Sequence, residues 1–185
     1  MKKLIILLAL FFLPDLSFSQ TSLDLDKSKI KWTGKKITNA SHWGSLYFSE
    51  ANLLFDGTDL IEGNFIVDMN SMSVDDIQGR GKERLENHLR NEDFFDVYNH
   101  KEAILKFNDR VSLENGSYNI TGSLTIKGIT NPINFKLVPS GNEFSCNLTF
   151  DRTKFEVNYR SGNFFENLGD RLILDDVELE VSLVQ

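Results

Sequence analysis

Apolar and polar residues alternate with a period of two along much of the chain, most clearly over residues 118–126. There Tyr118, Ile120 and Leu124 fall on one face, and mostly polar side chains occupy the positions between them. This alternation is typical of a half-buried β-strand. Four segments share the pattern, namely 103–111, 118–126, 133–137 and 144–150, with turns expected at Asn115-Gly116, Lys127-Gly128 and Ser140-Gly141-Asn142. Short turns between successive strands predict an antiparallel meander.

The amino-terminal half alternates in the same way. Strands are expected at 30–34, 43–55 and 60–69, the last two joined by a turn at Asp56-Gly57-Thr58. In the last segment, 171–184, the apolar positions change from even to odd numbers at Asp175-Asp176, which predicts a β-bulge. Long strands bent by bulges can close a sheet on itself. About eight such strands predict an all-β fold, an extended antiparallel barrel.

Residues 78–93 interrupt the strand pattern. The segment is rich in Arg, Glu, Lys and Leu, and Leu85 and Leu89 lie four residues apart on one helical face. It predicts one short, mostly polar helix near residues 79–90, lying over one end of the barrel. The sequence contains no linker and no internal repeat, so a single domain is expected.

The first residues have the pattern of a secretory signal peptide. Lys2 and Lys3 precede an apolar run over residues 4–13, and small residues at Ser17 and Ser19 mark a cleavage site. The run is about half the length that a membrane span requires, so the protein is not expected to span a membrane. We therefore expect removal of residues 1–19, a mature domain over 20–185, and a periplasmic or secreted protein.

Composition and charge restrict the partners. With 20 Lys and Arg against 27 Asp and Glu, the net charge is −7, which argues against a nucleic-acid ligand. The chain has 15 Phe but only 4 Tyr and 2 Trp, which indicates a broad apolar interior. Cys146, the single cysteine, rules out an intramolecular disulfide and fits a small core residue.

The sequence offers no catalytic apparatus and no metal site. His42, His88 and His100 lie in separate contexts without the spacing of metal ligands, and no nucleophile motif or phosphate loop is present. Glu178 and Glu180 alternate on the wet face of a strand, which favours a solvated surface over a pair of catalytic acids. No cofactor is expected other than a bound lipid.

Two adjacent phenylalanines follow the predicted helix. Phe94 and Phe95 could plug the barrel end or line the mouth of a ligand cavity, and the two roles do not exclude each other. Adjacent residues of an extended backbone point in opposite directions. We therefore expect one ring to enter the barrel and the other to pack under the helix beside Leu85 or Leu89.

Two longer motifs carry a family resemblance. Residues 88–97 read His-Leu-Arg-Asn-Glu-Asp-Phe-Phe-Asp-Val, and residues 122–132 read Gly-Ser-Leu-Thr-Ile-Lys-Gly-Ile-Thr-Asn-Pro. In both, the chain resembles the YceI-like domains, which are secreted bacterial lipocalin-like barrels; residues 152–170 are similar to Bacteroidetes-type members. The resemblance extends over residues 23–184. It implies an eight-stranded barrel with an apolar pore, which in some relatives holds a polyisoprenoid.

The function expected from pattern and resemblance is to bind a long apolar amphiphile: a polyisoprenoid, an isoprenoid quinone or a similar lipid. Two alternatives stay open, a ligand-free envelope interaction module and a small enzyme acting on a lipid, and a homodimer is also left open. The residues expected to bind the apolar chain are Trp32, Phe48, Phe55, Phe65, Phe94, Phe95, Phe107, Leu124 and Phe135. Those expected at the mouth or headgroup are His88, Arg90 and Asp96.

Overall fold

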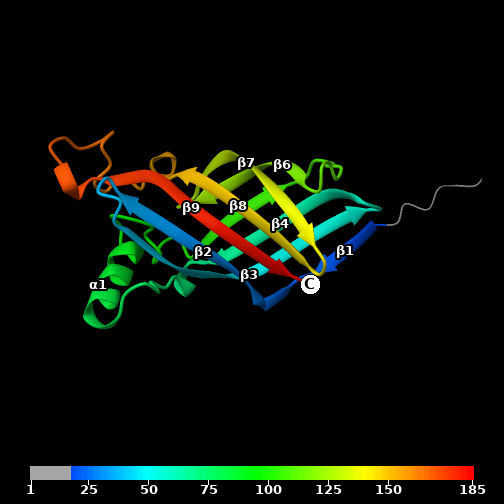
Figure 1. Cartoon of the computed structure of the whole chain (residues 1–185), viewed down its shortest axis with the longest axis horizontal. Coiled ribbons are helices and arrows are strands. Elements are labelled where there is room, and N and C mark those ends of the chain that lie inside the picture. The colour runs from blue at the N-terminus through cyan, green and yellow to red at the C-terminus, as the bar shows by residue number, and fades with distance from the viewer. Residues whose placement is uncertain (1–17) are drawn as a thin grey trace, which may run out of the picture.

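The computed structural model describes residues 18–185, which form nine strands and one α-helix (Figure 1). The strands are β1 (Phe18–Ser22), β2 (Asp24–Lys36), β3 (Ser41–Asp56), β4 (Asp59–Asp68), β5 (Glu102–Phe107), β6 (Tyr118–Ile126), β7 (Ile129–Ser140), β8 (Glu143–Asp151) and β9 (Ile173–Val184). The helix α1 spans Gly79–Arg90, and three short 3₁₀ turns are η1 (Met69–Ser71), η2 (Arg152–Phe155) and η3 (Gly169–Arg171).

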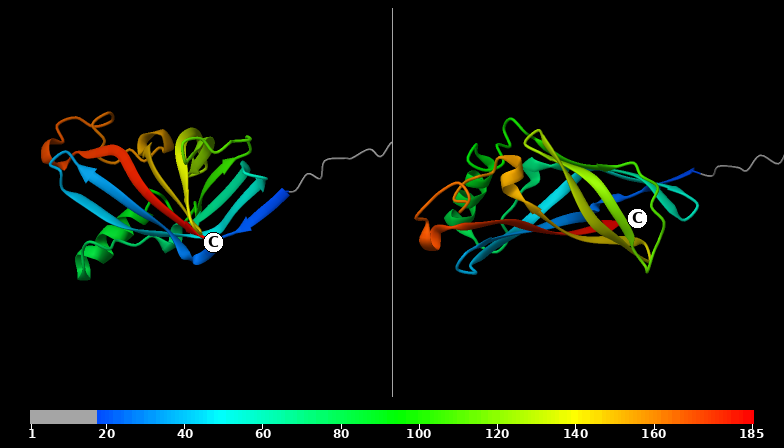
Figure 2. Two further views of the ribbon diagram at one scale, coloured as in Figure 1. Left: turned by 45° about the vertical axis from the view of Figure 1, so that its right-hand side comes forward. Right: turned by 90° about the horizontal axis from the view of Figure 1, so that it is seen from above.

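The sheet closes on itself. Its strand order is β1-β3-β2-β9-β8-β7-β6-β5-β4, and an additional pairing of β3 with β4 joins the two sides. Strands β2 to β9 therefore form a closed antiparallel barrel of eight strands, and β1 is an extra strand paired with β3. This confirms the predicted barrel. The barrel is extended, with α1 and the segment between η2 and β9 at the same end (Figures 1 and 2).

Tight turns set the register of the meander. Lys127 and Gly128 both have positive φ, 52° and 74°, as a two-residue hairpin turn requires, and they join β6 to β7 as predicted. Asn115 and Gly116 also form such a turn, which closes a bridge between Glu114 and Ser117. The expected strand 103–111 is shorter, however. Strand β5 ends at Phe107, and Val111 makes only an isolated bridge to Leu60 of β4.

The bulge expected in the last strand is present. In the ladder between β2 and β9, Gly34 is opposite Val177 and Lys36 is opposite Ile173. Residues 174–176 therefore face the single residue Lys35. The extra residues change which side of β9 faces inward, and they bend the start of the strand at the end of the barrel that carries α1.

The two ends of the barrel differ. At the end away from α1, side chains fill the interior: Leu53 and Leu60 are fully buried, and the ring of Phe55 packs against those of Tyr118 and Phe144, each with its centroid 6.1 Å away. At the other end, α1 and its flanking segments provide the cover (Figure 2).

The segment before α1 is fastened to the barrel wall by its backbone. Ser73 N–H donates to the carbonyl of Ser45 (3.0 Å), and the carbonyl of Ser73 accepts from the indole N–H of Trp32 (3.1 Å). The helix is tied to the same segment, since the Glu86 carboxylate accepts from the Val74 N–H at 2.9 Å and Arg90 donates to the Met72 carbonyl. The position of α1 thus depends on residues 72–74.

The predicted signal peptide falls almost entirely on residues 1–17, outside the described residues, and stays a prediction. Its last two expected residues, Phe18 and Ser19, begin β1. Within residues 18–185, no helix has the length and apolar character needed to cross a membrane.

Replacing Gly44 by alanine is expected to destabilise the barrel. A Cβ at Gly44 would lie 1.7 Å from the carbonyl oxygen of Ser73, and this backbone is held by the hydrogen bonds just described. Overpacking of this kind costs about 1–3 kcal/mol in the free energy of unfolding, measurable by chemical denaturation. Gly34→Ala is the matched control, because nothing lies within 4 Å of its Cβ position. Equal denaturation midpoints for the two variants would show that this close approach does not matter.

Candidate ligand-binding cavity

The barrel encloses a cavity of about 1100 Å³ that reaches the surface at the α1 end. All eight barrel strands contribute inward side chains to its wall, as the alternation along each strand requires. Exposed residues at its rim, among them Ala40, Gly81 and Asn87, show that it meets solvent there. Pockets for small molecules typically measure roughly 300–1,000 Å³, so this one is large enough for a sizeable ligand.

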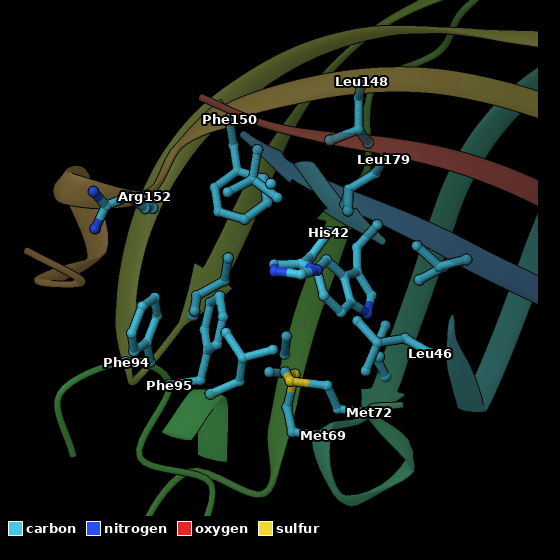
Figure 3. A pocket seen from close by; sticks show the side chains of 18 of the residues that line it. His42, Leu46, Met69, Met72, Phe94, Phe95, Leu148, Phe150, Arg152 and Leu179 are labelled. Atoms are coloured by element: carbon cyan, nitrogen blue, oxygen red, sulfur yellow. The ribbon is translucent and has the colours of Figure 1, made fainter. Parts of the chain in front are cut away.

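The wall is predominantly apolar. Aromatic and aliphatic side chains surround the interior, and Met69 and Met72 add two flexible thioethers to the wall (Figure 3). Leu85 and Leu89 of α1 also line the cavity, so the apolar face predicted for the helix is the face turned toward the interior. Such a surface gains free energy when an apolar chain displaces water from it.

Most residues expected to bind the apolar chain do line this cavity. They are Trp32, Phe48, Phe65, Phe94, Phe95, Leu124 and Phe135, and the expected mouth residue His88 lines it as well. Their placement agrees with the expectation, and contact with a ligand stays a prediction. The ring of His88 is packed edge-on against Phe94 and Tyr159, with centroids 4.9 and 4.7 Å away.

Phe55 and Phe107 are not part of the cavity wall, which corrects the expectation for both. Phe55 packs against Tyr118 and Phe144 in the filled end of the barrel. Phe107 packs edge-on against Phe135, and its ring occupies the space that a side chain at residue 63 would need, which glycine leaves free. Both rings are inward, but they lie at a depth where side chains already fill the barrel.

Arg90 and Asp96 do not line the cavity. Arg90 is engaged with the Met72 carbonyl and lies 3.8 Å from the Glu86 carboxylate, so it fastens the helix. Asp96 has a positive φ of 45° in the turns after α1, and its carboxylate accepts from the Asn99 side chain. Both residues therefore stabilise local structure.

The expected opposite orientation of Phe94 and Phe95 is wrong. Both rings line the cavity, with centroids 6.4 Å apart (Figure 3). Residues 92–95 and 97–99 form turns instead of extended backbone, so the alternation rule does not apply to this pair. The Phe95 N–H donates to the Leu89 carbonyl at 3.1 Å, which folds the chain back under the helix. Phe94 reaches both the cavity and the helix, through its contact with His88.

A model of the YceI-like domain matches residues 22–185 of the sequence. The chain belongs to the YceI-like domain family. This confirms the resemblance carried by the motifs at 88–97 and 122–132. In the structure the first motif forms the end of α1 and contributes Phe94 and Phe95 to the cavity wall, and the second forms most of β6 and its hairpin turn.

Solved structures share this fold. BcnA of Burkholderia cenocepacia is 22% identical with a TM-score of 0.69, and the match covers 89% of this chain and 99% of that one. A polyisoprenoid binding domain from Saccharophagus degradans is 15% identical, with a TM-score of 0.60 and coverage of 91% and 97%. The YCEI protein of Campylobacter jejuni is 13% identical, with a TM-score of 0.53 and coverage of 98% and 90%. No curated protein matches the sequence.

Arg152 anchors the segment that completes the mouth of this YceI-like domain. It is only 2% exposed, and its guanidinium donates to the carbonyls of Val157, Ile173 and Leu174 and to the Asp175 carboxylate at 3.0 Å. Burial lowers the pKa of the Arg152 guanidinium, and the nearby carboxylates oppose that shift. The side chain points away from the centre of the cavity (Figure 3). The bulge in β9 presents Asp175 to this arginine.

Sequence reasoning missed Arg152 and Tyr159. Both lie in the irregular stretch between β8 and β9, where no periodicity marks the buried positions. Tyr159 nevertheless lines the cavity and packs against His88 and Phe94. One signal could have pointed to this stretch: it has no strand pattern but still contains aromatic residues, which often pack against a buried surface.

The wall has few side chains that could act as nucleophiles or metal ligands. Cys146 lines the wall, and burial raises the pKa of its thiol to about 12, which keeps it protonated at neutral pH. His42 is the other histidine of the wall, and its Nδ1 lies 2.8 Å from an Asp76 carboxylate oxygen. Among residues 18–185, no group of three or more His, Cys, Asp or Glu side chains is arranged to hold a metal ion.

Replacing Arg152 by methionine is expected to lower the free energy of unfolding by about 3–5 kcal/mol, because it removes one partner from a buried ion pair. It also leaves three carbonyls without their donor. Lys154→Met, at an exposed position of the same 3₁₀ turn, is the matched control. If urea denaturation gives both variants the same stability, Arg152 does not anchor this segment.

Proposed function

We propose that this YceI-like domain is a binding protein that holds one long apolar amphiphile, such as a polyisoprenoid or an isoprenoid quinone, inside the barrel. The observation that carries the proposal is the cavity itself. An eight-stranded barrel is just wide enough either to fill with side chains or to hold one slender ligand. This barrel is filled at one end and hollow over about 1100 Å³ at the other.

The energetics fit an apolar chain. Each buried methylene contributes about 0.8 kcal/mol, so a five-carbon isoprene unit contributes roughly 3–4 kcal/mol before the costs of association. A chain of a few units therefore needs no specific polar contact within the wall. The related domain from Saccharophagus degradans is a polyisoprenoid binding domain, which agrees with a ligand of this class.

The proposal includes no catalysis, and it places the protein in the periplasm or outside the cell. The Cys146 thiol, protonated at neutral pH, is a poor nucleophile. Export rests on the predicted signal peptide over residues 1–19. A ligand-free interaction module is expected to have a barrel interior filled by interlocking rings. The hollow end of this barrel argues against that alternative.

Filling the cavity should weaken binding. Ala103 is a small, buried residue of the wall, and Ala103→Phe places a ring where the ligand chain is proposed to lie. If the ring displaces two methylene groups, the loss is about 1.5 kcal/mol, or roughly tenfold in Kd. The probe is geranylgeraniol, a C20 isoprenoid alcohol, and the measurement is titration of the delipidated protein by tryptophan fluorescence, with native mass spectrometry for stoichiometry.

Val138→Phe is the matched control, because Val138 is exposed on β7 and lies outside the cavity wall. We expect the wild type and this control to bind one molecule with equal affinity. Geranylgeraniol that fails to bind the wild type, or binds Ala103→Phe as tightly as the wild type, would contradict the proposal.

A further inference from the structure

The charged residues of the cavity wall all have the same sign. Its cations are Lys35, Lys36, Arg84, Arg152 and Arg160. No aspartate or glutamate stands among the described residues that line it, although the whole chain has 27 acidic residues against 20 basic ones. The composition of the protein therefore does not account for the charge of the wall.

Two of these cations already have partners. Lys35 pairs with Glu178, and Arg152 is held by Asp175 and three carbonyls. The other three, Lys36, Arg84 and Arg160, have no ion pair within the described part of the chain. Arg160 lies over the ring of Tyr159, with its guanidinium carbon 5.0 Å from the ring centroid. These three side chains are the ones free to meet a ligand.

The three free cations come from three different elements, and all three line the cavity. Lys36 ends β2, Arg84 is on α1, and Arg160 lies between η2 and β9. Lys36 and Arg160 are close because both flank Ile173: Lys36 is its partner in the β-ladder, and the Arg160 carbonyl accepts from its N–H at 3.0 Å. The first turn of α1 adds potential of the same sign, since it has no acidic residue and its residue Gly81 lines the cavity.

We propose that the amphiphile bound by this cavity has an anionic headgroup, a phosphate or a carboxylate, which Lys36, Arg84 and Arg160 bind at the mouth. The inference rests on the proposed function and specifies its ligand. Arginine and lysine are the side chains that recognise phosphate and carboxylate oxygens through charge-assisted hydrogen bonds. Their effect is concentrated at the rim of a low-dielectric cavity, where field lines are focused.

The test compares two ligands with the same tail, geranylgeraniol and geranylgeranyl monophosphate. We expect the wild type to bind the phosphate about tenfold more tightly, the effect of one or two charge-assisted hydrogen bonds. The preference should shrink as salt is raised, because the mouth is open to solvent. In the triple variant Lys36→Gln/Arg84→Gln/Arg160→Gln, the ratio of the two affinities should fall to near one.

The matched control is Lys29→Gln/Lys101→Gln/Lys136→Gln, which removes the same charge from exposed positions outside the cavity wall. It should keep the wild-type ratio. Equal binding of both ligands to the wild type overturns the inference and leaves the proposed function in place. A ratio that falls equally in both triple variants also overturns it, since net charge alone then explains the preference. If neither ligand binds the wild type, the proposed function fails.

Discussion

The pairing of β3 with β4 is the interaction on which the rest of the structure depends. Without it, the sheet from β1 to β4 would be an open ribbon with two unpaired edges, and no interior would exist. With it, every strand from β2 to β9 is paired along both of its edges, and the alternate side chains of all eight face one enclosed space. The width of that space is fixed by the strand number, so the side chains available at each level decide whether it is filled or hollow.

The chain distributes its large side chains unevenly along the barrel axis. Phe55, Tyr118 and Phe144 come together at one end and fill it. At the other end the wall side chains surround a cavity, and α1 and the segment before β9 cover it. Those segments are held by polar contacts: Glu86 to the Val74 backbone for α1, and Arg152 to Asp175 for the segment before β9. Apolar residues thus shape the pocket, while partly buried hydrogen bonds position its mouth.

Much of this fold could be predicted from the sequence, because period-two alternation and turn chemistry are local signals. Strand β6 has the bounds that its alternation indicates, and the bulge in β9 falls where the apolar positions change phase. The inward positions of Trp32, Phe48 and Phe65 follow from the same rule. Alternation gives the face of a strand but not the depth along the barrel axis, which is why Phe55 and Phe107 were misplaced. Phe94 and Phe95 were misplaced in orientation because turns, unlike strands, have no fixed side-chain alternation.

The most direct test of the account is native mass spectrometry of the protein purified without detergent from its own host. The account predicts a species carrying a single amphiphile per chain, which organic extraction removes and which leaves a folded barrel able to bind one molecule again. A spectrum that shows only the unliganded chain, from a preparation that also takes up no apolar chain when one is offered, would contradict it.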